Sequence, residues 1–366
     1  RAIKRREIGS RELTELYFAR IDRLNGAINA VIAEDREGAL ARAREADDAL
    51  ARGEDWGPLH GVPITVKESY DVAGFRTTWG VPEMRNNQAH TDALAIERLK
   101  KAGAIVMGKT NVPLRLADFQ SYNEIYGTTN NPWDRDRTPG GSSGGSAAAL
   151  AAGLTGFEMG SDIGGSIRNP AHFCGVFGHK PTWNLLPPRG HALPGTYAPP
   201  DISVIGPLAR SAEDLALAID LLAKPDEIAS RGLEVRLPRL ARPLSELRVA
   251  VWSNDAFAPV ADEVRARVER VARALEDCGA RVSHTARPEF AAAETHEVFQ
   301  YLLQSTMASR MSDADYAATQ AAVARFSPDD QRAGALTARA SVLSFRDWSR
   351  WTHQRYRLRR QWATFF

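Results

Sequence analysis

Two Gly-Gly-Ser segments lie close together in the chain, and each places a hydroxyl directly after residues that carry no side chain. The first is in RTPGGSSGGSAAALAAG, residues 137–153, and the second in GSDIGGSIRNPAHFCG, residues 160–175. Clusters of Gly and Ser are common in flexible linkers. Here the first runs into an Ala-rich segment of high helix propensity and the second into an apolar stretch. We therefore predict that both lie within a folded core.

Acyl transfer on a serine needs a nucleophile, a base, and backbone amides that can hold an oxyanion. Ser166 follows Gly164 and Gly165, and the missing Cβ atoms let successive N–H groups turn toward one point. Lys67 ends an apolar alternating pattern at 59–67, where desolvation lowers the pKa of an ammonium and makes a neutral amine available. Ser142 could carry a proton from Ser166 to Lys67. This chemistry requires no metal and no organic cofactor.

Two shorter motifs match other chemistries. GAIVMGKT, residues 103–110, fits the phosphate-loop pattern, but a helical pattern precedes it and the residues between the glycines indicate a strand, so we reject nucleotide binding. GSSGG, residues 141–145, fits the nucleophile elbow of α/β-hydrolase esterases with Ser143 as nucleophile. That interpretation leaves the second cluster unexplained, and we keep it as a minor alternative.

These segments also resemble the amidase signature family. The stretch GGSSGGSAAALAAGLTGFEMGSDIGGSIRNPA has serines 142 and 166 at the family's separation of 24 positions, and GVPITVKESYDVAG holds Lys67. GKTNVP, NNPWD, FCGVFGHKPT and GPLARSAEDL are similar as well, so the resemblance spans nearly all of 60–220. It implies that Ser166 is the nucleophile, that Ser142 is a bridging serine reached through a cis peptide, and that Lys67 is the base. The implied oxyanion-hole amides are those of Ile163, Gly164, Gly165 and Ser166.

The resemblance also implies a substrate-binding wall, for which we name Leu116, Asp118, Phe119 and Gly141. Three positions depart from the usual pattern: Ile163 stands where Thr is common, Glu68 where Asp is usual, and Trp79 where a small residue is usual. Trp79 suggests an altered pocket wall, which Trp183 and Tyr197 could also cover. Asp162 and Arg168 are expected to form an ion pair that fixes the nucleophile loop.

The surrounding patterns indicate the elements that must position these residues. Helical spacing runs from Ser10 to Leu24, over 35–52, over 91–102 and after the capping box at Ser211. Apolar runs at 59–67 and 104–107 indicate strands, and 247–252, 261–277 and 280–284 form a strand, helix, strand unit. We predict one α/β/α domain over 1–366, with a mixed, largely parallel sheet covered by helices on both faces. We expect a surface connection at 225–246 and a rim or lid at 186–200. Family members usually continue beyond the final QWATFF, so the C-terminal part of the family domain is expected to be missing.

Composition narrows the class of partner. Lysine and arginine total 47 against 45 acidic residues, and this balance argues against nucleic acid as the main ligand. We see neither an apolar run of membrane length nor a signal segment, and we expect a cytoplasmic protein. Cys174 and Cys278 fit no metal or redox spacing and are expected to be buried thiols.

We therefore predict a hydrolase for a small-molecule amide or carbamate. Aryl amides, fatty amides, small carboxamides and urethanes all remain open as substrates, and so does a homodimer. The main alternative is an amidotransferase A-type subunit that generates ammonia for a tRNA-dependent reaction with partner chains.

Overall fold

The computed structural model describes residues 1–238, 242–327, 329–330 and 332–366. The chain forms two compact units, Arg1–Val235 and Arg236–Phe366, and each is described by itself. Within the described residues, none of the helices combines the length and the apolar character that a membrane crossing requires. The extent of the family domain within the chain remains a prediction.

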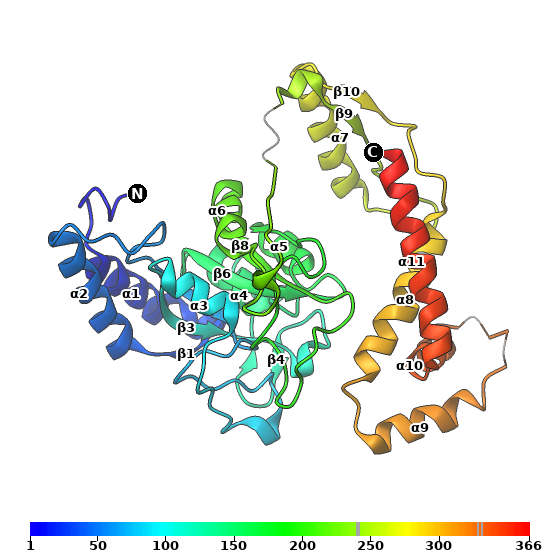
Figure 1. Ribbon diagram of the computed structural model, residues 1–366, viewed down its shortest axis with the longest axis horizontal. Coiled ribbons are helices and arrows are strands. Elements are labelled where there is room, and N and C mark those ends of the chain that lie inside the picture. The colour runs from blue at the N-terminus through cyan, green and yellow to red at the C-terminus, as the bar shows by residue number, and fades with distance from the viewer. Residues whose placement is uncertain (239–241, 328, 331) are drawn as a thin grey trace. The chain divides into compact units, whose positions relative to one another are not determined.

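The first unit opens with two helices, α1 (Ser10–Ile28) and α2 (Arg36–Ala51), which pack side by side (Figure 1). The buried stripe of α1 runs through Thr14, Phe18 and Ile21, whereas Leu16 is exposed. The Asp35 side chain caps α2 by accepting a hydrogen bond from the Gly38 amide. The other helices of this unit are α3 (Leu94–Lys101), α4 (Gly144–Ala151), α5 (Arg168–Cys174) and α6 (Ala212–Leu222), with 3-10 turns at Pro82–Met84, Leu114–Leu116 and Ala229–Arg231.

Two three-stranded sheets form the centre of the first unit. The strands β1 (Val31–Glu34), β3 (Ile105–Thr110) and β2 (Pro63–Lys67) lie in the order β1-β3-β2. The strands β6 (Phe157–Asp162), β8 (Val204–Ala209) and β7 (Phe177–Gly178) lie in the order β6-β8-β7. The edge strand β2 of the first sheet contacts the edge strand β6 of the second, so the two sheets meet along these strands. A short pair, β4 (Tyr122–Asn123) and β5 (Gly127–Thr128), completes the strands of this unit.

The sheets are mixed, as expected, but the prediction of a largely parallel arrangement needs correction. Among the described residues the parallel pairs are β2–β3 and β9–β10, while the pairs β1–β3, β4–β5, β6–β8 and β7–β8 are antiparallel. An apolar run shows that a strand is buried, yet its side-chain period is the same in either direction. Direction is therefore set by how the connections return, which the pattern does not record.

Burial of both faces explains why β2 and β3 can position chemistry. Every residue of the two strands is buried, including Lys67 and Lys109. Gly108 and Lys109 lie inside β3 itself, which confirms the rejection of a phosphate loop at 103–110. One apolar cluster includes Ile64 and Val66 of β2 and Met159 of β6. A second cluster includes the alanines of α4 together with Met107 of β3 and Leu208 of β8.

The second unit begins with a crossover of the predicted kind. Strand β9 (Arg248–Ala250) is parallel to β10 (Arg281–Ser283), and α7 (Asp262–Asp277) connects them. Four helices follow, α8 (Ala292–Ala308), α9 (Asp313–Val323), α10 (Ala333–Ser341) and α11 (Phe345–Phe365), and α8 packs against both α10 and α11 (Figure 1). The predicted connection at 225–246 has exposed 3-10 turns at Ala229–Arg231 and Leu244–Glu246, while 239–241 lie outside the described residues.

One of the two cysteines is buried as expected, and the other is exposed. Cys174 is buried at the end of α5, and burial raises the pKa of its thiol to about 12. Cys278 is exposed, because it caps the C-terminus of α7 at the surface turn that precedes β10. The prediction of a buried thiol is therefore confirmed for Cys174 and wrong for Cys278.

Candidate active site

Lys67 is the centre of the site. It is the last residue of β2 and has no exposed surface. Its Nζ lies 2.7 Å from the Oγ of Ser142, 2.9 Å from that of Ser143 and 3.0 Å from that of Ser161. Three serine hydroxyls therefore lie within hydrogen-bond distance of one buried amine. The amine is thus placed to exchange a proton with a serine.

The first Gly-Gly-Ser segment presents its serines from the start of a helix. The peptide bond between Gly141 and Ser142 is cis, as the family resemblance implies, and α4 begins two residues later at Gly144. Ser121 holds this turn from both sides, because its Oγ donates to the Gly140 carbonyl at 3.2 Å and accepts from the Gly144 amide at 3.1 Å. The Gly141 amide donates to Asn169 Oδ1 at 3.2 Å.

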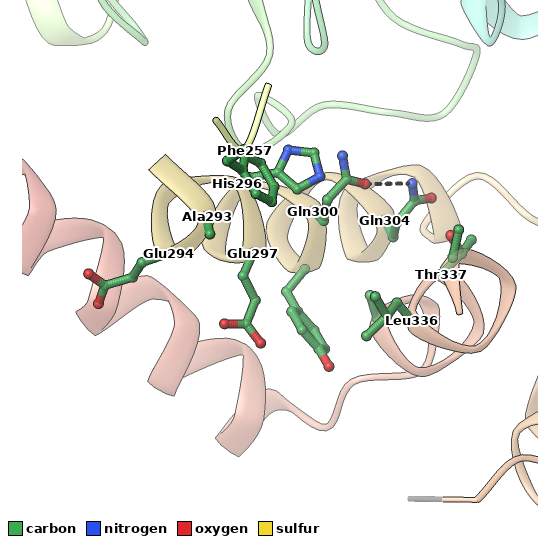
Figure 2. Close-up of a pocket in the computed structure, with 12 residues that line it drawn as sticks. Phe257, Ala293, Glu294, His296, Glu297, Gln300, Gln304, Leu336 and Thr337 are labelled. Atoms are coloured by element: carbon green, nitrogen blue, oxygen red, sulfur yellow. Dashed lines mark hydrogen bonds between the residues drawn. The ribbon is translucent and has the colours of Figure 1, made fainter. Parts of the chain in front are cut away.

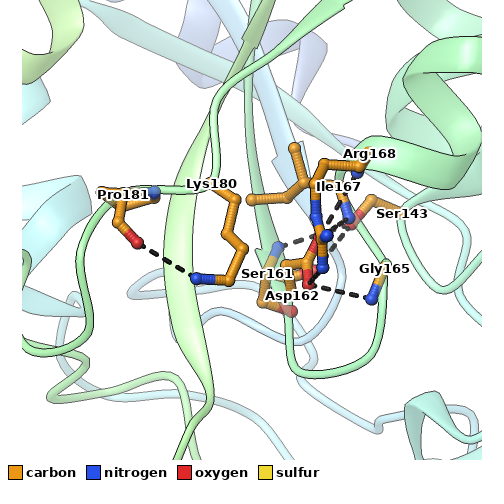
Figure 3. A network of polar contacts seen from close by, with 8 residues as sticks. All are labelled: Ser143, Ser161, Asp162, Gly165, Ile167, Arg168, Lys180 and Pro181. Carbon is orange, nitrogen blue, oxygen red and sulfur yellow. Dashed lines mark hydrogen bonds and ion pairs between the residues drawn. The ribbon is translucent and has the colours of Figure 1, made fainter. Parts of the chain in front are cut away.

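The second segment is a loop wrapped around a buried carboxylate (Figure 3). Asp162 ends β6 and accepts from the amides of Gly165 and Ile167 at 2.9 and 3.1 Å. The Arg168 guanidinium forms a bidentate pair with it at 2.9 and 3.0 Å, which confirms the expected ion pair. Burial alone would raise the pKa of Asp162, but the hydrogen bonds and charge of Arg168 and the two amides outweigh burial and hold it below its usual value. The Asp162 carboxylate therefore holds the loop that carries Ser166.

The four amides that we expected to form an oxyanion hole differ in their hydrogen bonding. The Gly165 N–H is directed at Asp162 and not into the site. Among the described residues, no hydrogen-bond partner is found for the amides of Ile163, Gly164 or Ser166. Ser166 itself is buried and only 5% exposed. An oxyanion hole made by the amides of Ile163, Gly164 and Ser166 therefore stays a prediction.

The residues expected to bind substrate lie along one segment next to the serines. A Cβ at Gly141 would meet the Asp118 carbonyl oxygen at 2.5 Å, so the backbone at 118–119 packs directly against the cis peptide. The exposed Phe119 ring lies within about 3.5 Å of where a Cβ at Gly165 would be. Leu116 is buried against Trp79, and the Asp118 carboxylate accepts hydrogen bonds from the Gln120 amide and the Tyr122 hydroxyl. The structure thus brings this segment to both Gly-Gly-Ser turns, and its contact with substrate remains a proposal.

Two departures from the family pattern prove to be neighbours. Glu68 accepts hydrogen bonds from the amides of Thr78 and Trp79. Burial raises the pKa of Glu68, although the charge of Lys109 opposes this shift. Trp79 is only 1% exposed and lies 5.2 Å from the His191 ring, measured between centroids. The larger side chain at 79 is therefore built into the core beside Leu116.

Hydrogen bonds to the first unit's core hold the loop at 186–200 near its residues 189–191. The Arg189 and Gly190 carbonyls accept from the Leu94 and Asp71 amides, and the Ser69 hydroxyl lies 3.0 Å from His191 Nε2. Farther along, Tyr197 is 96% exposed, so it covers no core. Trp183 is 41% exposed and its indole donates to the Pro200 carbonyl.

Sequence reasoning missed several residues that shape the site. Ser161 gives Lys67 its third hydroxyl, and Ser121 and Asn169 hold the first serine turn. The sequence signal for Ser161 was only its place shortly before the second Gly-Gly-Ser run. Ser143, which the sequence offered as the nucleophile of the α/β-hydrolase alternative, contacts Lys67 almost as closely as Ser142 does.

A separate cavity of about 600 Å³ lies within the second unit, between α8 and α10 (Figure 2). Its polar lining consists of residues such as His296, Glu297, Gln300 and Gln304, together with the Tyr301 ring. Among the described residues that line it, none is a serine, lysine or cysteine. It therefore lacks the nucleophile and base that the Lys67 site brings together.

Comparison with known proteins identifies the family of this chain. The Amidase family profile matches residues 12–362. The A-type subunit of the glutamyl-tRNA(Gln) amidotransferase from Carboxydothermus hydrogenoformans is 37% identical over 282 residues, which is 76% of this chain and 57% of that protein. The peptide amidase of Stenotrophomonas maltophilia superposes with a TM-score of 0.77 at 27% identity, over 98% of this chain and 77% of that one. A fatty acid amide hydrolase gives a TM-score of 0.82 at 25% identity, over 100% of this chain and 64% of that one.

The fold is that of amidase signature enzymes. The chain belongs to the amidase family. It spans a little over half the length of the curated relative from Carboxydothermus.

Proposed function

We propose that this protein hydrolyses the C–N bond of a small carboxamide or amide-like substrate through an acyl-enzyme on Ser166. The observation that carries the proposal is the buried Lys67 amine, which contacts Ser142 at 2.7 Å beside a loop whose amides at 163, 164 and 166 have no partner among the described residues. A base, a hydroxyl relay and donors for an oxyanion are the parts that serine-based acyl transfer needs.

In the first half-reaction, Ser166 Oγ attacks the carbonyl carbon of the substrate. Its proton passes to Ser142 Oγ while the Ser142 proton passes to the neutral Lys67 amine. The carbonyl oxygen becomes an oxyanion held by the amides of residues 163, 164 and 166. When the C–N bond breaks, the proton returns along the same path to the leaving nitrogen, which departs as ammonia or an amine.

In the second half-reaction, water replaces the amine. Lys67 removes one proton from the water through Ser142, and the resulting oxygen nucleophile attacks the ester carbonyl. The oxyanion forms again in the same amides, and the ester bond to Ser166 breaks. Ser166 regains its proton and the carboxylic acid, or the carbonic acid monoester from a urethane whose amine has already left, is released. The base that activates one nucleophile thus also protonates each leaving group.

The substrate class rests on the walls of the site. Phe119 is exposed beside Gly165, and Leu116 and Trp79 form a compact apolar cluster with Val81 and Val112. An exposed aromatic ring beside the loop of Ser166 suits aryl or alkyl amides and the matching carbamates. The solved relatives named for fatty acid amides and for peptide amides indicate that the fold serves different acyl groups.

A second candidate is an amidotransferase A-type subunit, which would release ammonia from an amide donor for use by partner chains. The curated relatives favour it, because three of them, at 34% to 40% identity, are A-type subunits of glutamyl-tRNA(Gln) amidotransferase. The same acyl-enzyme chemistry on Ser166 would serve both functions. The candidates differ in the leaving group and in the need for a partner.

One set of assays separates the two. The purified protein is sized by gel filtration and then incubated alone with an aryl anilide, an aryl carbamate and glutamine, with released arylamine and ammonia measured separately. Turnover of the anilide or carbamate by the isolated protein supports the hydrolase. Ammonia release from glutamine alone, with no cleavage of either aryl substrate, would replace it by the amidotransferase function. Ser166→Ala serves as the blank for every substrate.

A further inference from the structure

Glu158 is a buried carboxyl that the proposed reaction does not use. It is the second residue of β6 and has no exposed surface. A carboxyl in such a place is costly unless it is neutral or well paired. Its partners therefore indicate what it contributes.

The contacts of Glu158 join four elements. Thr65 on β2 donates its hydroxyl hydrogen to Glu158 Oε1. The hydroxyls of Thr110 on β3 and Ser146 on α4 lie 2.9 Å from each other and close enough to the carboxyl to affect its pKa. Oε2 has no hydrogen-bond partner of ordinary geometry among the described residues. The side chain is thus a junction of β2, β3, β6 and the first turn of α4.

Each of the joined elements carries a part of the reactive site. Lys67 follows Thr65 by two residues on β2, and it pairs in register with Thr110 on β3. Ser146 lies in the first turn of α4, just after the two serines that contact Lys67. Ser161, which also contacts Lys67, follows Glu158 on β6. A shift at the junction would therefore move the base relative to its hydroxyls.

We propose that Glu158 is a positioning residue that, as a neutral carboxylic acid, fixes Lys67 against the hydroxyl of Ser142. This inference rests on the proposed function for the role of Lys67 and Ser142. The junction itself is a feature of the fold and can be tested without substrate.

The neutral state of Glu158 follows from its surroundings. Burial raises its pKa to about 8, against the opposing hydrogen bonds of Thr65, Ser146 and Thr110. The ionisable groups on the packed elements are Lys67 on β2, Lys109 on β3 and Asp162 on β6, with Tyr70 beyond the end of β2; α4 has none. Burial also raises the pKa of Tyr70, and a charge on Glu158 adds to that shift. No arginine lies on these three strands to hold the carboxyl ionised.

The sign of the pH dependence follows from this shift. A carboxyl that titrates near 4.5 in the unfolded chain and at about 8 in the folded one binds its proton more tightly when folded. Its contribution to stability is therefore full below pH 4.5 and is lost as pH rises through about 8. Ionisation would also leave an unpaired charge at the junction, so the site should loosen on the alkaline side.

The test compares Glu158→Gln, a neutral side chain of the same shape, with Glu158→Ala, which removes the junction. Melting temperature, the rate of Ser166 labelling by a fluorophosphonate, and kcat and KM on a cleaved substrate are measured from about pH 6 to about pH 10, on both sides of the folded pKa. We expect Glu158→Gln to match the wild type at neutral pH and to keep more of its melting temperature and labelling rate at alkaline pH. Glu158→Ala should fold and lose about tenfold to a hundredfold in kcat with KM little changed, as expected for a misplaced base.

Two results would overturn the inference. One is a Glu158→Gln variant whose melting temperature and labelling fall with alkaline pH as steeply as those of the wild type. The other is a folded Glu158→Ala variant with wild-type kcat and labelling. If Glu158→Ala does not fold, the pH comparison with Glu158→Gln still decides. A wild-type protein that is not labelled at Ser166 contradicts the proposed function instead, while the melting curves continue to test the junction.

Discussion

The amide of Ser143 donates a hydrogen bond of 3.1 Å to the carbonyl oxygen of Ser166. This bond joins the two Gly-Gly-Ser segments directly, backbone to backbone. The Ser143 hydroxyl also lies 2.9 Å from Lys67 Nζ, and it contacts the Ser161 amide and carbonyl at 3.4 Å each. Ser143 therefore links the loop of Ser166 both to Lys67 at the end of β2 and to Ser161 on β6. Substitutions in this assembly should separate what each member does.

Ser166→Ala is expected to abolish covalent labelling by a fluorophosphonate and to reduce turnover by at least about a thousandfold. The reason is that the substitution removes the hydroxyl from the loop whose amides at 163, 164 and 166 have no partner among the described residues. Mass spectrometry of the labelled wild-type protein locates the modified serine. A label on Ser143 would favour the α/β-hydrolase interpretation with Ser143 as nucleophile.

Lys67→Ala is expected to reduce kcat by about a hundredfold to ten-thousandfold, the usual contribution of a general base. Lys101→Ala is the control, because Lys101 is exposed and pairs with Glu97 on its own helix. Activity of the wild type should persist after treatment with EDTA, since Lys67 and the serines supply every proton transfer in the proposal. Full activity of Lys67→Ala, or a wild type that needs added zinc, would contradict the mechanism.

Ser142→Ala should lower kcat far more than Ser143→Ala does. The distances from Lys67 Nζ, 2.7 Å to Ser142 and 2.9 Å to Ser143, differ too little to assign the relay by themselves. The Ser143 hydroxyl, however, is shared with the β6 backbone, which suits a structural role. Turnover of one chromogenic substrate, with circular dichroism to confirm folding, measures both variants.

The double variant of Lys67 and Ser142 sharpens this assignment. Residues that act as one unit lose their effect together, so the double variant should be little slower than the slower single variant. Independent roles would instead multiply the two losses. An inactive Ser143→Ala beside a nearly normal Ser142→Ala would assign the relay to Ser143.

Asp162→Asn is expected to lower the melting temperature at neutral pH. It should also make the melting temperature fall less steeply as the pH is lowered. The folded pKa of Asp162 lies below its usual value of 3.8, so the carboxylate stabilises the fold above that pH and this contribution is lost as pH falls below it. The asparagine cannot titrate and keeps a weaker set of hydrogen bonds to Arg168 and the loop amides. Melting temperatures of both proteins between about pH 7 and about pH 3 test this, and a constant difference across the range would show that the carboxylate charge contributes nothing.

Gly141→Ala is expected to reduce both turnover and melting temperature. Its new methyl group would meet the Asp118 carbonyl at 2.5 Å and displace either the serine turn or the segment beside it. Gly26→Ala is a matched control, because Gly26 lies within α1 with open space around its Cα. Alanine there should raise stability by about 0.5–1 kcal/mol through helix propensity. Unchanged turnover in Gly141→Ala would show that the 118–119 backbone is not fixed against the serines.

Residue types and their spacing were enough to propose the residues of a reactive site in this protein. The glycines before Ser142 and Ser166 and the apolar strand before Lys67 predict serine-based acyl transfer with a lysine base, because these features depend on local residue types. The separation of the two serines adds the resemblance to the amidase signature family. The capped helix after Ser211 and the crossover at 247–284 were predicted for the same reason, since caps and hydrophobic periods are local signals.

How those parts meet depended on packing between distant segments. The antiparallel pairing of β6 with β8 follows from how a long connection returns, and the local pattern does not contain that information. The three hydroxyls at Lys67 come from the turn before α4 and from β6, far from Lys67 in sequence, and Ser161 gave no signal of its own. Trp79 and Glu68 became neighbours, and the Gly165 amide turned to Asp162, through the same packing. Contacts between distant segments are fixed by the fold as a whole, which is why residue type and spacing could propose the site but not its arrangement.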